Sequence, residues 1–343
     1  MSTSPRTGRA TVYTVADQAG VSVATVSRVL QEPHRVRDST RAKVLRVVDE
    51  LDYVPHGGAR SLASRRHEAH GLVLPELGGP YYSELLLGYE SVAAEAGHSV
   101  VLVLTEGKDD VDSAVRRLAG SVDGMALMGA DQVLDDTLAA VRRQVPVIGL
   151  TGDTGRGLES FSTENEASAQ QLTRHLLAHG RRKVAFVGTP TLAPDVLERW
   201  LGFVAAHDGA PVRPALPAQL EESEGRRIAD DLRAEDRDID ALVCANDELA
   251  LAVIHRLTQH GVRVPDDVAV VGWDDVMAAR YIRPALSTVR QPVRELGAQA
   301  AQRMRGLISG RPGAATHHTL PTTVVIRESC GCPDPSLPTY PTS

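Results

Sequence analysis

The sequence is poor in cysteine, and its three cysteines cannot form a disulfide framework across 343 residues. Cys244 stands alone, whereas Cys330 and Cys332 form a C-x-C pair near the end of the chain. No second cluster accompanies this pair in the sequence to complete a tetrahedral metal site. We therefore expect the cysteines to be structural or incidental, and we expect neither a metal nor a cofactor.

Long apolar runs are also missing. No stretch reaches the roughly 18 uninterrupted apolar residues that a membrane-spanning helix needs. Arg6 and Arg9 are followed by no apolar segment of the kind found in a secretory signal. We expect a protein that stays in the cytoplasm and has no membrane partner.

Catalytic motifs are absent as well. The sequence contains no P-loop, no GxSxG and no HExxH pattern, and no paired acid–base constellation. We therefore expect a protein that is not an enzyme.

The charge is unevenly distributed along the chain. The net charge is -7, yet residues 1–66 carry 11 Lys and Arg against 6 Asp and Glu. The remaining residues carry a net charge of -12. A basic segment joined to a larger acidic body indicates an anionic partner at the N-terminal end. The length exceeds one ordinary core and predicts two or three domains.

The first 55 residues predict helices only. Thr11 can cap a helix over Val12–Ala19, which Gly20 ends, and Ser22 can cap a second helix from Val23 to about Leu30. The second helix would bury a face formed by Val26, Val29 and Leu30, at spacings of three and four. Two short helices joined by a tight turn are typical of a helix-turn-helix.

A third helix should begin at Asp38 or Ser39 and end before Pro55. Its apolar stripe would comprise Val44, Val47, Val48 and Leu51. The small, basic and glycine-bearing residues 56–66 are typical of a linker.

Beyond the linker, strands and helices alternate. The predicted strands are Gly71–Leu74, Ser99–Leu104, Gly124–Met128, Val145–Leu150, Val184–Val187, Ala241–Cys244 and Val268–Gly272. Amphipathic helices between them include Ser83–Ala96, Ala167–His179 and Glu248–Gln259. This rhythm favours parallel sheets covered by helices, and its length favours two α/β lobes. The proline-rich residues 331–343 predict a disordered tail.

The chain resembles the LacI/GalR family of bacterial transcriptional regulators over residues 11–330. The resemblance in the first part is carried by TVYTVADQAGVSVATVSRVL and VRDSTRAKVLRVVDELDYVPH. It continues in the body with GLVLPELGGPYYSELLLGYE, HLLAHGRRKVAFVG, ALVCANDELALAVI and VAVVGWDD.

The resemblance implies an all-α helix-turn-helix head and an α/β core of two Rossmann-like lobes of the periplasmic-binding-protein type. The implied parts are a flexible tail over 1–10, a DNA-binding head over 11–55, a hinge over 56–66 and a core over 67–330. The N-lobe would span about 67–165 and 291–320, and the C-lobe about 166–289 and the end of the chain. A homodimer is expected, because no heptad-rich helix follows residue 330 to form a coiled-coil tetramer.

The same resemblance assigns the residues that contact double-stranded DNA. Val23, Ala24 and Arg28 would contact base edges in the major groove. The guanidinium of Arg28 could donate two hydrogen bonds to guanine O6 and N7. The expected phosphate contacts are Tyr13, Ser22, Thr25, Ser27, Arg35, Arg37 and Thr40. Ser22 has the alternative role of a helix cap.

The hinge PHGGARSL resembles the Pro-Asn-x-x-Ala-Arg-x-Leu pattern of the family. Ala59, Arg60 and Leu62 match it, and Leu62 would be the wedge in the minor groove. His56 and the pair Gly57–Gly58 depart from it. We expect a hinge that orders only on DNA, because each glycine weakens a helix by about 1 kcal/mol.

Ligands of parallel α/β lobes bind at the carboxyl ends of the strands. The residues expected around an effector are Tyr81, Tyr82, Arg199, Asn246, Trp273, Asp274 and Gln291. Asp247 and Asp275 are expected to cap helices, and Arg199 has the alternative role of a salt bridge within its lobe.

Departures from the family leave the effector unnamed. Leu150, Thr151 and Gly152 stand where many relatives carry a carboxylate, Glu164–Ser168 alters an Asp-Asn-x-x-Gly motif, and Leu220 replaces an aromatic residue. The leading hypothesis is a repressor that binds a palindromic operator and is released by a small sugar-like effector. The alternatives are a regulator with a purine or nucleoside as corepressor, and a solute-binding protein.

Overall fold

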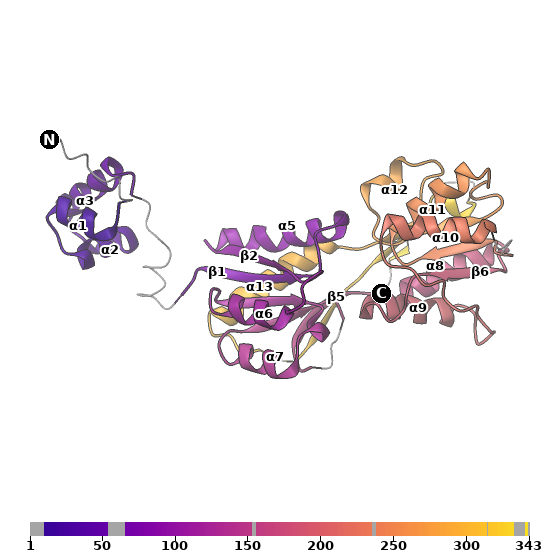
Figure 1. Ribbon diagram of the computed structural model, residues 1–343, viewed down its shortest axis with the longest axis horizontal. Helices are drawn as coiled ribbons and strands as arrows, with labels where there is room; N and C mark the ends of the chain where they lie inside the picture. The colour runs from indigo at the N-terminus through magenta and orange to yellow at the C-terminus, as the bar shows by residue number, and fades with distance from the viewer. Residues whose placement is uncertain are drawn as a thin grey trace. The chain divides into compact units, whose positions relative to one another are not determined.

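The computed structural model describes residues 10–53, 66–152, 156–234, 238–313, 315–332 and 340–341. The chain forms two compact units, Met1–His67 and Glu68–Ser343 (Figure 1). Within the described residues, no helix has both the length and the apolar character to cross a membrane.

The N-terminal unit, the head, contains three helices. These are α1 (Val12–Ala19), α2 (Val23–Gln31) and α3 (Asp38–Glu50), with the short turn η1 (Pro33–Arg35) between the last two. Thr11 Oγ1 accepts from the Thr14 amide at 3.3 Å at the start of α1, and Gly20 ends it with a φ of 59°. The predicted helices of the head are therefore confirmed.

The core of the head is built mainly from valine. Its fully buried residues are Val15, Ala16 and Ala19 of α1, Val26 and Val29 of α2, Val44 and Val47 of α3, and Tyr53. Leu30 and Val48 are partly buried against this cluster. Since one face of α2 is used in the core, the opposite face of α2 is left at the surface of the head.

The N-lobe of the body contains a six-stranded parallel sheet in the order β10-β5-β4-β3-β1-β2. The strands are β1 (Ala69–Leu74), β2 (Ser99–Leu104), β3 (Gly124–Met128), β4 (Val147–Leu150), β5 (Glu159–Thr163) and β10 (His317–Leu320). Helices α5 (Gly79–Glu95) and α13 (Val293–Ile308) cover one face, and α6 (Val111–Ala119) and α7 (Asp135–Arg142) the other (Figure 1). The turn η2 (Ala130–Gln132) precedes α7. Strands β1, β3 and β4 are buried along their whole length, as expected of parallel strands covered on both faces.

Helices α5 and α13 pack very closely through two glycines. A Cβ on Gly88 would lie 1.9 Å from the Arg294 carbonyl oxygen, and one on Gly297 would lie 2.2 Å from the Leu85 carbonyl oxygen. Only glycine permits this approach of two helix backbones.

The C-lobe contains a second parallel sheet, β6-β7-β8. Its strands are β6 (Val184–Val187), β7 (Ala241–Cys244) and β8 (Ala269–Val271). Its helices are α8 (Glu166–Ala178), α9 (Pro194–Ala205), α10 (Glu222–Ala234), α11 (Asp247–Gln259) and α12 (Met277–Tyr281). Phe186, Phe203 and Trp273 are the largest fully buried side chains of this core.

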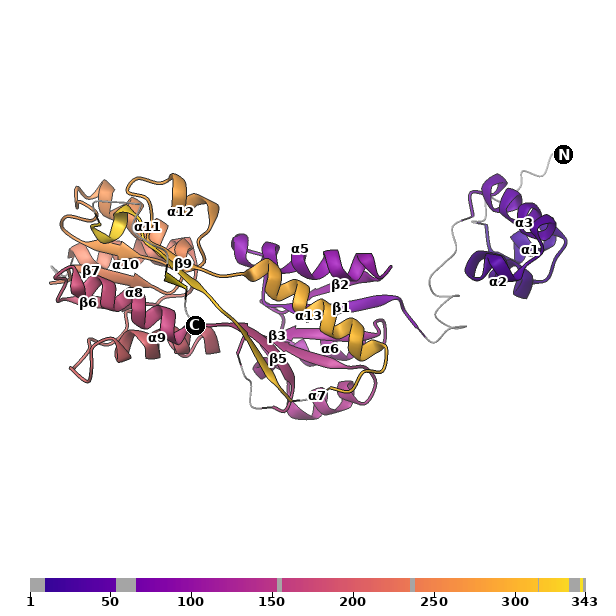
Figure 2. The same ribbon diagram turned by 180° about the vertical axis from the view of Figure 1, so that it is seen from behind.

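The chain passes between the lobes three times, after β5, after β9 (Thr288–Arg290) and after β10. The last passage leads into β11 (Thr323–Val325), which pairs antiparallel with β9 and with β12 (Tyr340–Pro341). Figure 2 shows this yellow segment running from beside β5 into the C-lobe. The predicted fold class, a helix-turn-helix head with a two-lobed α/β core, is confirmed.

Two expectations about the end of the chain need correction. Residues 331–343 were expected to be disordered, but Cys332 is buried and Tyr340–Pro341 pair with β11; residues 333–339, 342 and 343 lie outside the described residues. The C-x-C pair was expected to have no further cluster beside it. The turn η3 (Glu328–Cys330) instead brings Cys330 and Cys332 against His175 and His179 of the α8 region.

Candidate functional site

The outward face of α2 carries the predicted base-reading residues. Val26 and Val29 are turned into the core of the head, whereas Ala24 and Arg28 are exposed and Val23 is half-buried. The short Ala24 side chain leaves room beside Arg28 for a base edge or a thymine methyl group.

Ser22 caps α2. Its Oγ accepts from the Thr25 amide at 3.2 Å and lies 2.9 Å from Thr25 Oγ1. Its alternative role as a helix cap is thus confirmed, and its contact with a phosphate remains a prediction.

The other expected phosphate contacts lie at the surface of the head. Tyr13, Arg35 and Arg37 are exposed, and Thr25, Ser27 and Thr40 are half-buried. Arg35 forms an ion pair with Glu32 at 3.0 Å, which DNA phosphates would have to replace. The hinge residues Ala59, Arg60 and Leu62 lie outside the described residues.

In the body, Arg199 of α9 is the centre of a buried polar group. Its Nε donates to Asn165 Oδ1 at 2.8 Å, and its Nη1 donates to the Ala245 carbonyl at 2.7 Å. Its guanidinium carbon lies 4.7 Å from the centroid of the Trp273 ring. These close partners are all neutral, so a salt bridge within the lobe is not what holds this arginine.

Three polar atoms around Arg199 are buried without a hydrogen-bond partner among the described residues. They are Tyr81 Oη, Asp195 Oδ1 and Trp273 Nε1. Burial raises the pKa of Asp195 and of Tyr81, and nearby Arg199 opposes both shifts. Because buried polar groups are nearly always paired in native proteins, such a set marks a place where a polar ligand would find partners.

Asp274 links this group to the crossover. Gln291 Nε2 donates to Asp274 Oδ1 at 2.5 Å, and Thr163 at the end of β5 donates to Gln291 Oε1. Burial raises the pKa of Asp274 to about 7, although Arg199 and the Gln291 hydrogen bond both oppose the rise. One hydrogen-bonded chain therefore joins the N-lobe, the crossover and the C-lobe.

The remaining predicted residues lie around the same group. Tyr82 packs edge-to-face on Tyr81, with ring centroids 5.5 Å apart. Asn246 follows directly on Ala245, whose carbonyl Arg199 binds, but the Asn246 side chain is already used in the protein. It accepts from the Leu249 amide as the cap of α11 and donates to the Leu220 carbonyl, both at 3.0 Å.

The expectation that Asp247 and Asp275 cap the helices that follow them is wrong. Asn246 caps α11, while the Asp247 carboxylate accepts from Thr288 Oγ1 at 2.7 Å and the Val276 amide at 2.9 Å. Asp275 is the buried partner of three arginines, Arg280, Arg290 and Arg327.

Sequence reasoning missed three members of the Arg199 group. The first two are Asp195 and Glu198 of α9. Asp195 lies four residues before Arg199, one helical turn away, so helical spacing could have suggested it. Asn165 Nδ2 donates to Glu198 Oε2 at 3.1 Å while its Oδ1 binds Arg199. The altered Glu164–Ser168 motif keeps this asparagine, and its Glu164 binds the α8 amides of Ala167 and Ser168.

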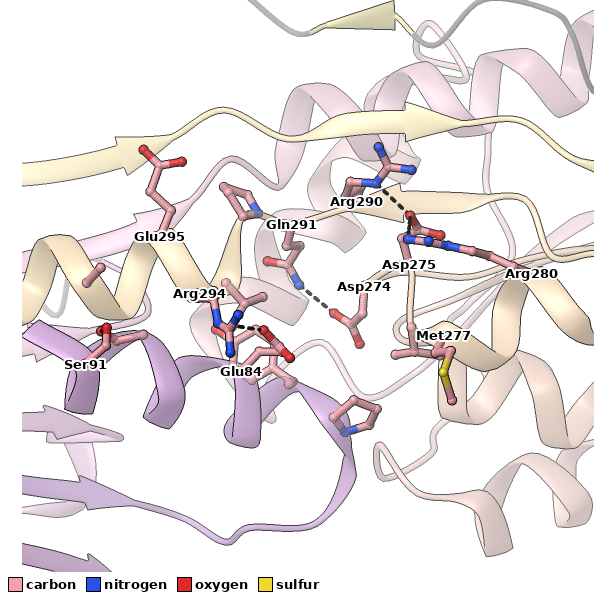
Figure 3. Close-up of a pocket in the computed structure, with 17 residues that line it drawn as sticks. Glu84, Ser91, Asp274, Asp275, Met277, Arg280, Arg290, Gln291, Arg294 and Glu295 are labelled. Atoms are coloured by element: carbon pink, nitrogen blue, oxygen red, sulfur yellow. Dashed lines mark hydrogen bonds and ion pairs between the residues drawn. The ribbon is translucent and has the colours of Figure 1, made fainter.

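A cavity of about 800 Å³ adjoins the group (Figure 3). Tyr81, Asp274 and Gln291 line it, together with the Glu84–Arg294 ion pair of 3.4 Å. Arg199 and Trp273 are not in its lining, so the cavity meets the Arg199 group at Tyr81 and Asp274 without enclosing it. The partnerless polar atoms, rather than the cavity, indicate where a ligand would bind.

Comparison with known proteins identifies both units. Residues 11–56 match the model of bacterial regulatory proteins of the lacI family, and residues 173–330 match the periplasmic binding protein-like domain. Catabolite control protein A of Streptococcus mutans is 33% identical over 87% of this chain and 91% of its own.

Two solved structures are similar along nearly the whole chain. The lac repressor dimer bound to operator and the anti-inducer ONPF has 27% identity and a TM-score of 0.82, covering 94% of this chain and 99% of its own. The transcriptional regulator CelR in complex with cellobiose has 29% identity and a TM-score of 0.69, covering 94% and 100%.

Proposed function

The chain belongs to the LacI family of bacterial transcriptional regulators, and we propose that it represses transcription from a palindromic operator until a small, uncharged, sugar-like effector binds. It would act in the cytoplasm, where its operator DNA lies, and it would catalyse no reaction. The alternative of a solute-binding protein is not favoured, because the chain carries a head of the lacI family.

The head supports the DNA part of the proposal. Arg28 is exposed on α2 beside the short Ala24, and the opposite face of α2 is held by Val26 and Val29. A rigid helix with one strong hydrogen-bonding reader fits the major groove. Tyr13, Ser22, Arg35 and Arg37 would position the helix on phosphates. Residues 56–66 would act as the hinge.

The strongest support for the ligand part is the Arg199 group with its three buried, partnerless polar atoms. A phenol hydroxyl, an indole N–H and a carboxylate oxygen around one guanidinium match a compound with several hydroxyls, each able to donate and accept. CelR, which is similar in structure, is described in complex with cellobiose.

The acidic surroundings favour an uncharged ligand over a phosphorylated one. Burial raises the pKa of Glu76, and repulsion by Glu106 and Glu221 adds to the rise. Burial also raises the pKa of Glu248, and repulsion by Glu76 raises it further. A sugar phosphate would add two negative charges to this environment, in which the Arg199 group itself supplies one guanidinium.

Release of the operator would follow from closure of the lobes. The chain Thr163–Gln291–Asp274 crosses the boundary between them, so a ligand bound to Asp274 and Tyr81 would favour one arrangement of the lobes. That arrangement would separate the two heads of a homodimer.

The body supports the homodimer through apolar residues at its surface. Met277 and Tyr281 of α12 are 74% and 76% exposed, and Leu87 of α5 is 48% exposed. Large apolar side chains that remain exposed on a folded domain are typical of an interface. We propose that a second copy of the chain covers them.

The test has two arms. In fluorescence anisotropy with a library of palindromic duplexes, we expect one operator to bind at least about 10³-fold more tightly than random DNA. Uniform binding to all duplexes would contradict the repressor function. A thermal-shift screen of neutral sugars, sugar phosphates, purines and nucleosides then identifies the effector. The proposal requires a hit among neutral sugars that weakens operator binding; a purine that strengthens it would establish the corepressor alternative.

A further inference from the structure

Two imidazole nitrogens and two thiol sulfurs, all possible metal ligands, lie close together in the C-lobe, outside the effector site. His175 Nε2 lies 3.3 Å from Cys330 Sγ and 3.2 Å from Cys332 Sγ. His179 Nε2 lies 3.2 Å from Cys332 Sγ, and the two imidazole centroids are 4.5 Å apart. The ligand atoms of His175, Cys330 and Cys332 all lie within 4.8 Å of one another.

Local structure explains why the two histidine side chains lie on one side of their helix and the two thiols on one side of the C-x-C segment. His175 and His179 are four residues apart at the end of α8, so both side chains lie on one face of the helix. Between the cysteines, Gly331 has a φ of 94°, a conformation that residues with a Cβ rarely adopt. This turn brings both thiols to the same side of the short C-x-C segment.

The distances among His175, Cys330 and Cys332 suit one tetrahedral metal ion, and His179, beside Cys332, is placed to supply a fourth ligand. Zinc binds cysteine sulfur at about 2.3 Å and histidine nitrogen at about 2.0 Å, so the sulfur–nitrogen edge of such a tetrahedron is roughly 3.5 Å. The three sulfur–nitrogen distances need to widen by only a few tenths of an ångström. Two thiolates also neutralise the charge of Zn²⁺, which suits ligands that are buried, as Cys330 and Cys332 are.

We propose that His175, His179, Cys330 and Cys332 form a structural zinc site. The H-x3-H spacing is usual for such sites, whereas the C-x-C spacing is one residue shorter than the common range. Two sulfur and two nitrogen ligands favour zinc among the divalent metals, and four protein ligands leave no position open for catalysis.

The site would fasten the end of the chain to the C-lobe. Cys330 and Cys332 follow the last passage between the lobes, and they are 155 and 157 residues from His175 in the sequence. A metal that joins such distant segments removes conformational freedom from the unfolded chain and stabilises the folded one. The proposal is independent of the effector and of the operator.

Cobalt is the probe, because tetrahedral Co²⁺ bound to thiolates has visible ligand-field bands and a near-ultraviolet thiolate-to-metal charge-transfer band. Full-length protein without a histidine tag is reduced, stripped of metal and titrated with Co²⁺. We expect both bands to saturate at one equivalent, zinc to bleach them, and zinc to raise the melting temperature. Absence of the charge-transfer band at one equivalent would overturn the proposal.

Variants locate the site. Cys332→Ser and His179→Ala should weaken cobalt binding by more than the roughly 10–100-fold caused by loss of a supporting outer group. The His179 side chain is exposed, so His179→Ala should fold even if a cysteine variant does not. Cys244→Ala and His255→Ala are the matched controls, since Cys244 lies in the lobe core and His255 at the surface, and both should bind cobalt as the parent does. Unchanged binding by both site variants would mean that the ion is adventitious and the proposal wrong.

Discussion

The guanidinium carbon of Arg199 lies 4.7 Å from the centroid of the Trp273 ring, while Trp273 Nε1 is buried without a partner among the described residues. The guanidinium thus stacks on the face of the indole, and the indole N–H remains free to donate a hydrogen bond to a ligand. Tyr81 Oη and Asp195 Oδ1 are likewise buried without a hydrogen-bond partner among the described residues. The group therefore bears an energetic cost in the free protein that a hydroxyl-bearing ligand would relieve.

Removing one of these partnerless groups should weaken effector binding without destabilising the protein. Tyr81→Phe deletes a hydroxyl that makes no hydrogen bond in the free protein, so the free energy of unfolding should stay constant or rise. Effector affinity should fall by about 0.5–1.5 kcal/mol, or roughly threefold to tenfold. Denaturant unfolding and isothermal titration calorimetry measure the two quantities.

Tyr89→Phe is the matched control for this pair of measurements. Tyr89 Oη is also buried without a partner, but it lies in the N-lobe core beside His70. Its removal should affect stability as Tyr81→Phe does and should leave effector affinity unchanged. Equal affinity losses in both variants would contradict the assigned site.

Arg199→Lys should uncouple the effector from the operator. Lysine keeps the charge but loses the fork that binds Asn165 and the Ala245 carbonyl, and it stacks less well on Trp273. We expect a loss of about 1.5–3 kcal/mol in stability, operator binding close to that of the parent, and no release by effector. Arg174→Lys, in the exposed pair with Asp208, should change none of these in an anisotropy assay.

Local signals made the head and most strands predictable. Caps at Thr11 and Ser22 and a glycine stop at Gly20 depend on neighbouring residues only, and the structure confirms the helices they bound. Strands such as Ser99–Leu104 and Ala241–Cys244 were predicted to the residue because they are continuous apolar runs. The strands β5, β9, β10 and β11 were not predicted, because polar residues interrupt them and none is a continuous apolar run.

Long-range contacts account for what sequence reasoning missed. Asp275 was assigned to a cap because a helix follows it, but its partner Arg327 is 52 residues away. The C-x-C pair seemed isolated because the two histidines beside it lie more than 150 residues earlier. The resemblance to a family suggested Tyr81, Arg199 and Asp274, whereas Asp195, four residues before Arg199 on its helix, is distinguished by its burial and its partnerless oxygen.

The pKa of Asp274 predicts a specific dependence of stability on pH. Burial raises this pKa from 3.8 to about 7, so the folded protein holds a proton that the unfolded chain has released. The contribution of Asp274 to stability should therefore fall as the pH rises from about 4 to about 7, and level off above. Asp274→Asn should make the fall in stability shallower without abolishing it, because burial also raises the pKa of Asp247 and of Asp195, so the variant should gain stability relative to the parent across this window. Urea unfolding at a series of pH values measures it; Asp208→Asn, an exposed carboxylate, should run parallel to the parent.

The two roles of Ser22 can be separated by substitution. Ser22→Asp keeps a side-chain acceptor for the Thr25 amide, so the stability of the head should be unchanged, but its charge should repel a phosphate. Ser22→Ala should lose about 1 kcal/mol of stability with the cap. If the phosphate contact exists, operator affinity falls strongly for Ser22→Asp and only modestly for Ser22→Ala. Equal operator affinity for Ser22→Asp and the parent would leave the cap as the sole role.

Arg28 and Arg35 should differ in how they affect DNA binding. Arg28→Ala removes the one strong hydrogen-bonding reader of α2, so it should cost about 1–3 kcal/mol on the operator and relax specificity at one base pair of each half-site. Arg35→Ala removes a phosphate contact and should weaken operator and random DNA alike, lowering the slope of log K against log salt by about 1. Anisotropy titrations on the operator, on operators altered at single positions and on random duplexes, each at several salt concentrations, distinguish the two patterns. Because Val23 and Ala24 offer no hydrogen bonds, an Arg28→Ala protein that still discriminated fully at every position would mean that DNA shape and the hinge carry the specificity.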